Sequence, residues 1–355
     1  MEKESNDRLV SPIKLSDEDK RQDNILRPEL LDGFVGQKKI TENLRVFVKS
    51  ARMRKEPLDH VLLAGPPGLG KTTLAFIIAR ELGVNIKATS APVIDKAGDL
   101  ASILTGLEAN DVLFIDEIHR LSPAIEEILY PAMEDRSIDI LVGQGVGAKS
   151  IKLSLAPFTL VAATTRTGLL TAAFRDRFGI PLRLNYYEPE ELKAIALRSA
   201  KALGTKIADD AALEIAKRAR RTPRIVNRLL KRVADFSVVE GADEITLQTA
   251  RYALDKLDVD EMGLDEMDRR ILTAIIEKYN GGPVGGKTLA ISVGEEPDTL
   301  EDYYEPFLVQ TGMIKRTPQG RIALEAAYRH LGLAGTPPTV SEQESLFAPD
   351  DINGA

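Results

Sequence analysis

The chain of 355 residues contains no cysteine and only three histidines. Without cysteine there are no disulfides, no thiolate metal ligands and no cysteine nucleophile. Three histidines also give little basis for a zinc site. These absences set aside disulfide scaffolds, thiol enzymes and zinc enzymes as classes.

Long apolar runs are absent too. The N-terminus, MEKESNDRLVSPIKLSDEDK, has no apolar stretch of the kind a signal peptide needs, and no later run is long enough to span a bilayer. We therefore expect a soluble, cytoplasmic protein without membrane association. The net charge of −7 argues against binding nucleic acid through bulk charge, but it allows a local basic surface.

The apolar residues that are present indicate an α/β region followed by helices. The hydrophobic fraction of 43% allows sizeable cores, and the length allows two or three domains. Near-continuous apolar runs at 60–64, 111–116, 158–164 and 182–185 are typical of parallel strands buried on both faces. After Tyr187 a helix is predicted between Pro189 and Gly204, and further segments with helical spacing follow, as in a small bundle.

A third region begins after a linker-like stretch, DVDEMGLDE. It contains a predicted helix at 265–278, a Gly-rich turn, further helical segments and two short β runs that flank TPQG. Helices followed by such a hairpin suggest a winged-helix module. We therefore expect five parts: a tail at 1–24, an α/β domain at 25–186, a helical domain at 187–257, a winged-helix domain at 258–334 and a tail at 335–355.

The segment GPPGLGKT, residues 65–72, matches the phosphate-loop pattern G-x-x-x-x-G-K-[ST]. Its glycines, among them Gly68 and Gly70, allow backbone N–H groups to curl around phosphate oxygens. Lys71 supplies positive charge, the Thr72 hydroxyl is suited to bind Mg²⁺, and Thr73 follows in the helix that presents its positive end to the phosphates. An ordinary Gly-rich turn would not need both a preceding strand and a following helix, so the pattern predicts binding of ATP with Mg²⁺.

Two acids follow a buried strand about 45 residues after the phosphate loop, in VLFIDEIHRL. Asp116 at the strand end is suited to hold the hydration shell of Mg²⁺ beside Thr72. Glu117 is a candidate general base for an attacking water. An apolar run that ends in Asp-Glu is by itself usually a strand entering a helix, but the phosphate loop upstream favours the catalytic interpretation.

Five segments in this order resemble the AAA+ ATPases: LLAGPPGLGKTTLA, LFIDEIHRL, LVAATTRTGLL, FRDRFG and RTPRI. The stretches LRPELLDGFVGQ, ILVGQGVGAKSI and RTPQGRIA are similar, more specifically, to the RuvB family, the motors of Holliday junction branch migration. The resemblance covers about residues 25–333. It implies an α/β AAA+ P-loop NTPase domain, a helical lid and a C-terminal winged-helix head.

The resemblance also implies roles for polar residues beyond the loop. Thr165 matches the sensor-1 position near the γ-phosphate, with Thr164 as the competing candidate. Arg177 matches the arginine finger that reaches the neighbouring subunit's nucleotide, and Arg175 is nearly as plausible. Arg224 matches sensor 2, which the lid contributes to the γ-phosphate.

Further nucleotide contacts are implied on both sides of a subunit interface. Leu26 and Arg27 match a segment that lines the adenine pocket, and Tyr187 matches a residue beside the nucleotide at the domain junction. The stretch from Met133 to Arg136 resembles one that faces the adjoining protomer's nucleotide, through Glu134, Asp135 and Arg136.

Residues 137–155 alternate around a Gly-rich turn, which predicts a hairpin. Taken alone, such a hairpin would be expected to pack on its own domain. The resemblance implies instead that it docks on a RuvA-type junction-binding protein, through the apolar residues Ile140, Leu141 and Val142.

The second hairpin is locally basic although its domain is not. Residues 265–333 contain eleven acids and eight bases, whereas residues 312–330 contain four bases and one acid. Arg316 and Arg321 flank the turn and match the family's DNA-contacting positions. Two arginines at a hairpin tip can straddle phosphates without reading bases, although a protein-binding winged helix is the alternative.

Together with these features, the resemblance implies a hexameric ATP-driven motor that pulls duplex DNA at Holliday junctions, with a RuvA-type partner and a RuvC-type resolvase. Two alternatives share the phosphate loop. A clamp-loader-like ATP switch would gate binding without movement, but it would not need the winged-helix head. An ATP-regulated initiator would recognise a particular DNA sequence, which needs contacts to bases rather than to phosphates.

Overall fold

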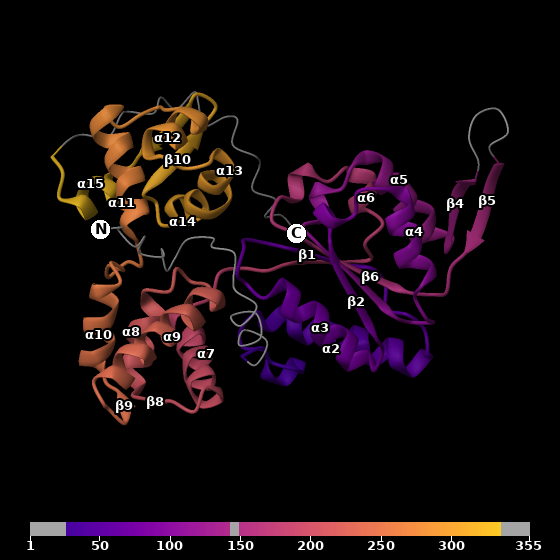
Figure 1. The fold of residues 1–355 in the computed structure, drawn as a ribbon, viewed down its shortest axis with the longest axis horizontal. Coiled ribbons are helices and arrows are strands. Elements are labelled where there is room, and N and C mark those ends of the chain that lie inside the picture. The colour runs from indigo at the N-terminus through magenta and orange to yellow at the C-terminus, as the bar shows by residue number, and fades with distance from the viewer. Residues whose placement is uncertain (1–25, 143–148, 335–355) are drawn as a thin grey trace, which may run out of the picture. The chain divides into compact units, whose positions relative to one another are not determined.

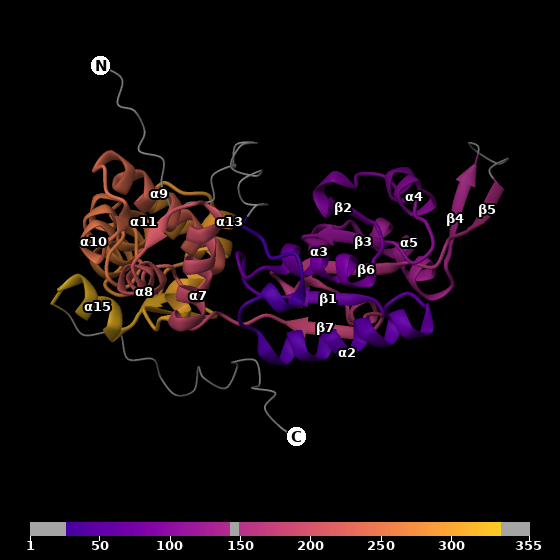
Figure 2. The same cartoon turned by 90° about the horizontal axis from the view of Figure 1, so that it is seen from below.

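The computed structural model describes residues 26–142 and 149–334 of the chain. The described residues fall into two compact units, 26–247 and 248–334. Figures 1 and 2 show the elements of each unit in two views. Among the described residues, no helix combines the length and the apolar character needed to cross a membrane.

A five-stranded parallel sheet forms the centre of the first unit, in the order β2-β3-β6-β1-β7. The strands are β1 (Val61–Ala64), β2 (Ile86–Ser90), β3 (Val112–Asp116), β6 (Thr159–Thr164) and β7 (Ile180–Arg183). Strands β1 and β6 are buried along their whole length, which confirms the expectation from their apolar runs. Strand β2 was not predicted, because this edge strand is largely polar, has no buried residue and so lacks an apolar run.

Helices cover both faces of this sheet (Figure 2). They are α2 (Lys38–Arg54), α3 (Lys71–Leu82), α4 (Ala97–Thr105), α5 (Pro123–Glu134) and the short α6 (Ala172–Arg175). On one face, Leu113 and Ile115 of β3 share a buried core with Leu100 of α4 and Leu129 of α5. Short 3-10 turns occur at Leu31–Gly33, Ala91–Val93, Ile118–Arg120 and Thr167–Leu169.

The predicted hairpin is present as antiparallel strands β4 (Ser137–Val142) and β5 (Lys149–Ser154). Figure 1 shows it standing away from the α/β core, although its base is anchored there by the fully buried Ile138. Ile140, Leu141 and Val142 lie in β4, and the turn at 143–148 lies outside the described residues.

The first unit also contains three helices of the predicted lid, α7 (Pro189–Ala202), α8 (Asp209–Lys217) and α9 (Pro223–Val239). The two-residue strands β8 (Lys206–Ile207) and β9 (Glu244–Ile245) pair in parallel beside them. Helix α7 begins at the predicted proline, and a capping box between Glu188 and Glu191 closes its first turn.

The second unit is helical with one small hairpin, as predicted for a winged helix. After α10 (Leu247–Lys256), the predicted helix at 265–278 is α-helical over Glu266–Thr273 (α11) and continues as a π-helical turn over Ala274–Lys278. There follow α12 (Gly286–Val293), α13 (Pro297–Thr299), a π-helical turn (Leu300–Tyr304) and α14 (Glu305–Gln310). The hairpin of β10 (Ile314–Thr317) and β11 (Gly320–Ala323) precedes α15 (Glu325–Leu331).

Replacing Asp265 by alanine should loosen the start of α11. Asp265 and Asp268 form a reciprocal capping box, in which each carboxylate accepts the other residue's N–H at 2.9 Å. Losing such a cap costs about 1 kcal/mol, so amide hydrogen exchange over 266–273 should become roughly fivefold faster in the full-length chain. The exposed Asp243→Ala serves as the control. Unchanged exchange in Asp265→Ala would show that this box does not hold the helix start.

Candidate functional site

The phosphate loop joins β1 to α3 and approaches neighbouring parts of the chain closely. Gly65 and Gly68 have φ values of +144° and +80°, which residues with a Cβ rarely adopt. A Cβ on Gly65 would lie 2.7 Å from the carbonyl oxygen of Leu184, and one on Gly68 would lie 3.2 Å from the Cβ of Arg224. These positions therefore require glycine because backbone after β7 and the lid helix α9 press against the loop.

Lys71, the first residue of α3, is buried and turned back onto the loop. Its ammonium donates hydrogen bonds to the carbonyl oxygens of Gly65, at 2.6 Å, and Pro66, at 2.8 Å. Burial lowers the pKa of Lys71 to about 8, while Asp116 opposes this shift and Arg224 adds to it. The lysine charge is thus held at the loop in a partly desolvated state, where an anionic ligand would stabilise it.

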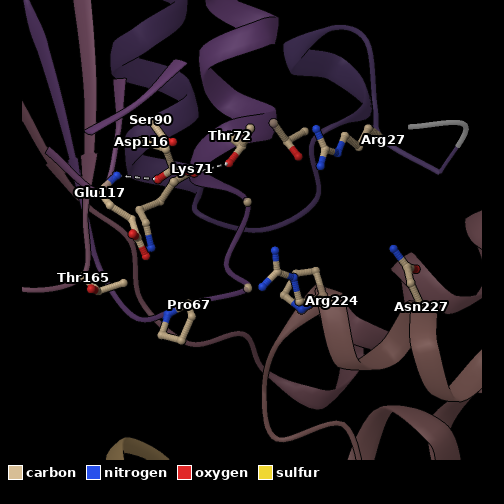
Figure 3. Close-up of a pocket in the computed structure, with 14 residues that line it drawn as sticks. Arg27, Pro67, Lys71, Thr72, Ser90, Asp116, Glu117, Thr165, Arg224 and Asn227 are labelled. Carbon is tan, nitrogen blue, oxygen red and sulfur yellow. Dashed lines mark hydrogen bonds between the residues drawn. The ribbon is translucent and has the colours of Figure 1, made fainter. Parts of the chain in front are cut away.

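Asp116 and Thr72 meet beside the loop (Figure 3). The Thr72 hydroxyl donates to Asp116 Oδ2 at 3.3 Å, and the Glu117 N–H donates to Asp116 Oδ1 at 2.9 Å. One carboxylate and one hydroxyl fit Mg²⁺, which keeps several waters and takes other ligands from substrate phosphates. The contact between these two residues brings together the pair that the sequence motifs predicted.

The ends of β3 and β6 present Glu117 and Thr165 to the same cavity. Glu117 forms an ion pair with Arg120 at 3.1 Å. Thr164 is buried instead: its hydroxyl lies 3.0 Å from Nδ1 of His119 and accepts the Arg166 N–H. Of the two threonines proposed for sensor 1, Thr165 is therefore the one that faces the cavity.

This cavity, of about 430 Å³, lies between the loop and the lid. Figure 3 shows Lys71, Asp116 and Glu117 on one side and Arg224 on the other, at the start of α9. The cavity brings together most of the predicted nucleotide residues, namely Arg27, Gly68, Gly70, Lys71, Thr72, Thr73, Asp116, Glu117, Thr165 and Arg224.

Four further lining residues were not predicted as site residues, namely the two prolines Pro67 and Pro223 and the polar residues Ser90 and Asn227. Ser90 ends β2 and is the register partner of Asp116, so it was missed together with its polar strand. Asn227 lies three residues after Arg224 on α9, a spacing that places both on one helix face. That spacing could have identified Asn227 from the sequence.

Leu26 and Tyr187 were predicted to contact the nucleotide, but they do not line the cavity. Both are buried, with 3% and 1% of their surface exposed. The Tyr187 hydroxyl donates to the Leu69 carbonyl at 3.1 Å, and burial raises the pKa of Tyr187. Tyr187 therefore supports the phosphate loop from within the protein.

The remaining predicted residues form a second group away from this cavity. Arg177 is 23% exposed, and its Nε lies 3.2 Å from Glu134. Arg136 and Arg177 line a separate cavity of about 870 Å³, while Arg175 and Asp135 are exposed. None of Glu134, Asp135, Arg136 and Arg177 lines the nucleotide cavity of its own chain.

Three family models match consecutive parts of the chain. Residues 26–184 match the Holliday junction DNA helicase RuvB P-loop domain, 187–260 the RuvB AAA lid domain and 261–332 the RuvB C-terminal winged helix domain. The chain belongs to the RuvB family. This confirms the expected α/β P-loop domain, lid and winged helix in an ATP hydrolase family that acts on DNA.

Solved structures of Thermotoga maritima RuvB are similar to the chain over most of its length. A mutant with lysine changed to arginine is 54% identical, with a TM-score of 0.81, and the match covers 87% of this chain and 98% of that one. The structure described as the RuvB Holliday junction branch migration motor is 52% identical, with a TM-score of 0.80, and the match covers 87% and 99%.

In the RuvB-type winged helix, Arg316 and Arg321 face each other across the hairpin as register partners. Their Nε atoms contact the two oxygens of one carboxylate, Glu305, at 2.5 and 2.7 Å. Arg321 also donates to the Glu301 carboxylate at 2.7 Å. Glu305 is fully buried, Arg321 is 15% exposed and Arg316 is 48% exposed. The acids that brace both arginines were not foreseen, because they lie up to 20 residues away in sequence.

Nucleotide binding should depend on pH through Lys71. Its pKa is about 8 in the free site, and bound phosphates would raise it by favouring the charged form. Affinity is then fully present below pH 8 and is lost as the pH rises through 8 toward the higher pKa of the bound state. Calorimetric titration with a non-hydrolysable ATP analogue should show about tenfold weaker binding at pH 9 than at pH 7, with proton uptake.

The matched control for this measurement is Lys71→Arg, since a guanidinium keeps its proton throughout this range. Its binding should be nearly independent of pH between 7 and 9. If the arginine variant keeps the same pH profile, the titrating group is not Lys71.

Proposed function

We propose that the chain is a subunit of an ATP-driven motor, a homo-hexameric ring that pulls duplex DNA to move Holliday junctions during recombination and DNA repair. In this proposal it works in the cytoplasm with a RuvA-type junction-binding protein and a RuvC-type resolvase. Membership of the RuvB family supports ATP hydrolysis and action on DNA. The observation that carries the ring is that Arg177 and residues 134–136 do not line the cavity at the phosphate loop of their own chain, whereas most of the other predicted nucleotide residues do.

The first group would bind ATP within one subunit. The phosphates would lie on the loop, where Lys71 exchanges its hydrogen bonds with the Gly65 and Pro66 carbonyls for phosphate oxygens. Glu117 would accept a proton from the attacking water once ATP or the neighbouring subunit draws it from Arg120. Thr165 would orient that water or the γ-phosphate.

Thr72 and Asp116 would hold Mg²⁺ beside the phosphates, directly or through its waters. When bound, the ion would neutralise charge on the β- and γ-phosphate oxygens. Arg27 would lie beside the base and ribose on the other side of the cavity, with Leu26 and Tyr187 supporting this wall from the core.

The second group would complete the neighbouring subunit's site. Arg177 would reach the γ-phosphate across the interface, and Glu134, Asp135 and Arg136 would line the same interface. A finger supplied in trans stabilises the charge of the transition state and raises turnover by about 10³- to 10⁵-fold. Hydrolysis would therefore require assembled rings, which distinguishes this proposal from a monomeric ATP switch.

The lid would link hydrolysis to movement. The Arg224 N–H donates to the Gly68 carbonyl at 3.3 Å, so the start of α9 is attached to the phosphate loop itself. The Arg224 side chain, which lines the cavity, would bind the γ-phosphate. Loss of that phosphate would release the lid contact and allow the lid to rotate against the α/β domain.

The winged helix would hold DNA through its backbone. Arg316 and Arg321 offer guanidinium groups suited to phosphates, and contacts to phosphates do not depend on sequence. The projecting hairpin of β4 and β5 would bind the RuvA-type partner through Ile140, Leu141 and Val142. The phosphate contacts suit a motor that must hold duplex DNA of any sequence, and the hairpin would attach this motor to the junction-binding protein.

The purified protein should dissociate four-way junctions with ATP, and a RuvA-type partner should stimulate this reaction. Lys71→Ala removes the positive charge that would face the phosphates within the subunit. Arg177→Ala removes the positive charge that would face them across the interface. We expect each variant to lose at least a hundredfold in ATP turnover and to lose junction movement. ATP hydrolysis without junction movement, even with the partner, would contradict the motor and favour an ATP switch.

Arg316→Ala should weaken binding to duplex DNA equally for unrelated sequences. Removing one phosphate contact should reduce the slope of log K against log salt concentration by about one. Fluorescence anisotropy with two duplexes of different sequence, over a range of salt concentrations, measures both effects. Arg316→Lys keeps the charge and should retain most of the slope. A loss confined to one sequence would instead indicate base recognition.

A further inference from the structure

The side chain of Arg177 lies on the ring of Tyr130. The guanidinium carbon is 4.3 Å from the ring centre, within the range of a cation–π contact. A second contact comes from NH1, which donates to the Ala173 carbonyl at 2.6 Å. The third is the ion pair with Glu134 at 3.2 Å. Three groups thus define one orientation for a side chain that is only 23% exposed.

The ion pair is the loosest of these contacts. Among the described residues, Arg177 Nε finds no partner with hydrogen-bond geometry, although it is buried. Glu134 itself is 56% exposed and therefore screened by water. The aromatic face and the Ala173 carbonyl consequently carry most of the orientation.

Tyr130 is in turn tied to the short helix that precedes Arg177. Its hydroxyl donates to the Glu126 carboxylate at 2.5 Å and lies 3.3 Å from the Thr171 hydroxyl. Thr171 donates to the same carboxylate at 2.8 Å and caps α6 by accepting the Phe174 N–H at 3.2 Å. The Phe174 ring also packs against Tyr130, with centres 5.6 Å apart. One tyrosine therefore touches both the arginine and the start of the helix that precedes it.

We propose that Tyr130 is a positioning residue for Arg177, whose ring holds the guanidinium and whose hydroxyl fixes α6 through Glu126 and Thr171. This inference rests on the proposed action of Arg177 in the neighbouring subunit's site. A free arginine side chain has many rotamers, and a charged group accelerates a reaction most when it is oriented in advance. Tyr130 would supply that orientation before the subunits meet.

The first test separates turnover from binding. Tyr130→Leu removes the aromatic face and the hydroxyl, and we expect kcat for ATP in assembled rings to fall about tenfold. Nucleotide affinity should stay within twofold, because Tyr130 does not line its own chain's cavity. Tyr130→Phe keeps the face and should lose threefold or less. Tyr252→Leu, at a half-exposed tyrosine in the other unit, is the control and should behave like the unchanged protein.

The second test asks in which subunit Tyr130 acts. Tyr130→Leu is mixed with Glu117→Gln, which lacks the proposed base but keeps Tyr130 and Arg177. In mixed rings, some Tyr130→Leu subunits have a Glu117→Gln neighbour whose Arg177 reaches their nucleotide site. ATP turnover at those sites should recover. The parallel mixture of Arg177→Ala with Glu117→Gln should recover as well, while Tyr130→Leu with Arg177→Ala should not.

Recovery for Arg177→Ala without recovery for Tyr130→Leu would overturn the inference and leave the ring proposal standing. In that case Tyr130 would affect only the nucleotide site of its own subunit. If neither variant recovers, Arg177 does not act in trans, and the proposed ring and the inference fail together. Equal losses of kcat in Tyr130→Phe and Tyr130→Leu would also contradict a role for the aromatic face.

Discussion

The hydrogen bonds accepted by the carbonyl groups of the phosphate loop determine how the whole site is built. The carbonyls of Gly65 and Pro66 accept from Lys71, that of Gly68 from the Arg224 N–H, and that of Leu69 from Tyr187. In a trans peptide the N–H points opposite to the C=O, so each of the last two bonds turns an N–H toward the other side of the loop. The first two carbonyls precede prolines, which have no N–H to offer. Contacts from the core and from the lid on one side of the loop therefore orient N–H groups toward the side where an anion would bind.

Much of this arrangement could be predicted from the sequence because its signals are local. The phosphate-loop pattern, the acids after an apolar strand and the proline at the start of α7 all depend on neighbours in the chain. The polar edge strand β2 gives no such signal, so neither this strand nor Ser90 at its end was predicted. The choice between Thr164 and Thr165 depends on how β6 is oriented and on the contact with His119, 45 residues away. The hydrogen bond of Tyr187 to the phosphate loop could not be predicted for the same reason, because its partner Leu69 lies 118 residues earlier.

The distribution of arginines shows a common theme in the first unit. Arg224 and Arg177 line different cavities, and contacts within the chain fix each of them: the backbone N–H of Arg224 bonds to the phosphate loop, and the side chain of Arg177 contacts a carbonyl group and an aromatic ring. The backbone of Arg224 and the side chain of Arg177 are thus restrained by contacts within the chain itself. The positions of these two positive charges therefore depend on packing contacts as much as on their place in the sequence.

The carboxylate of Glu305 extends this theme to the wing. Because it is fully buried between Arg316 and Arg321, both side chains lose their rotamer freedom when the domain folds rather than when DNA binds. If these arginines bind DNA as proposed, each contact with a phosphate would begin from ordered groups, and each release would return them to an ion pair instead of to water. The ion pair would then offset part of the free energy gained from each phosphate, so such a contact would be made and broken many times along a duplex without a deep minimum at any one position.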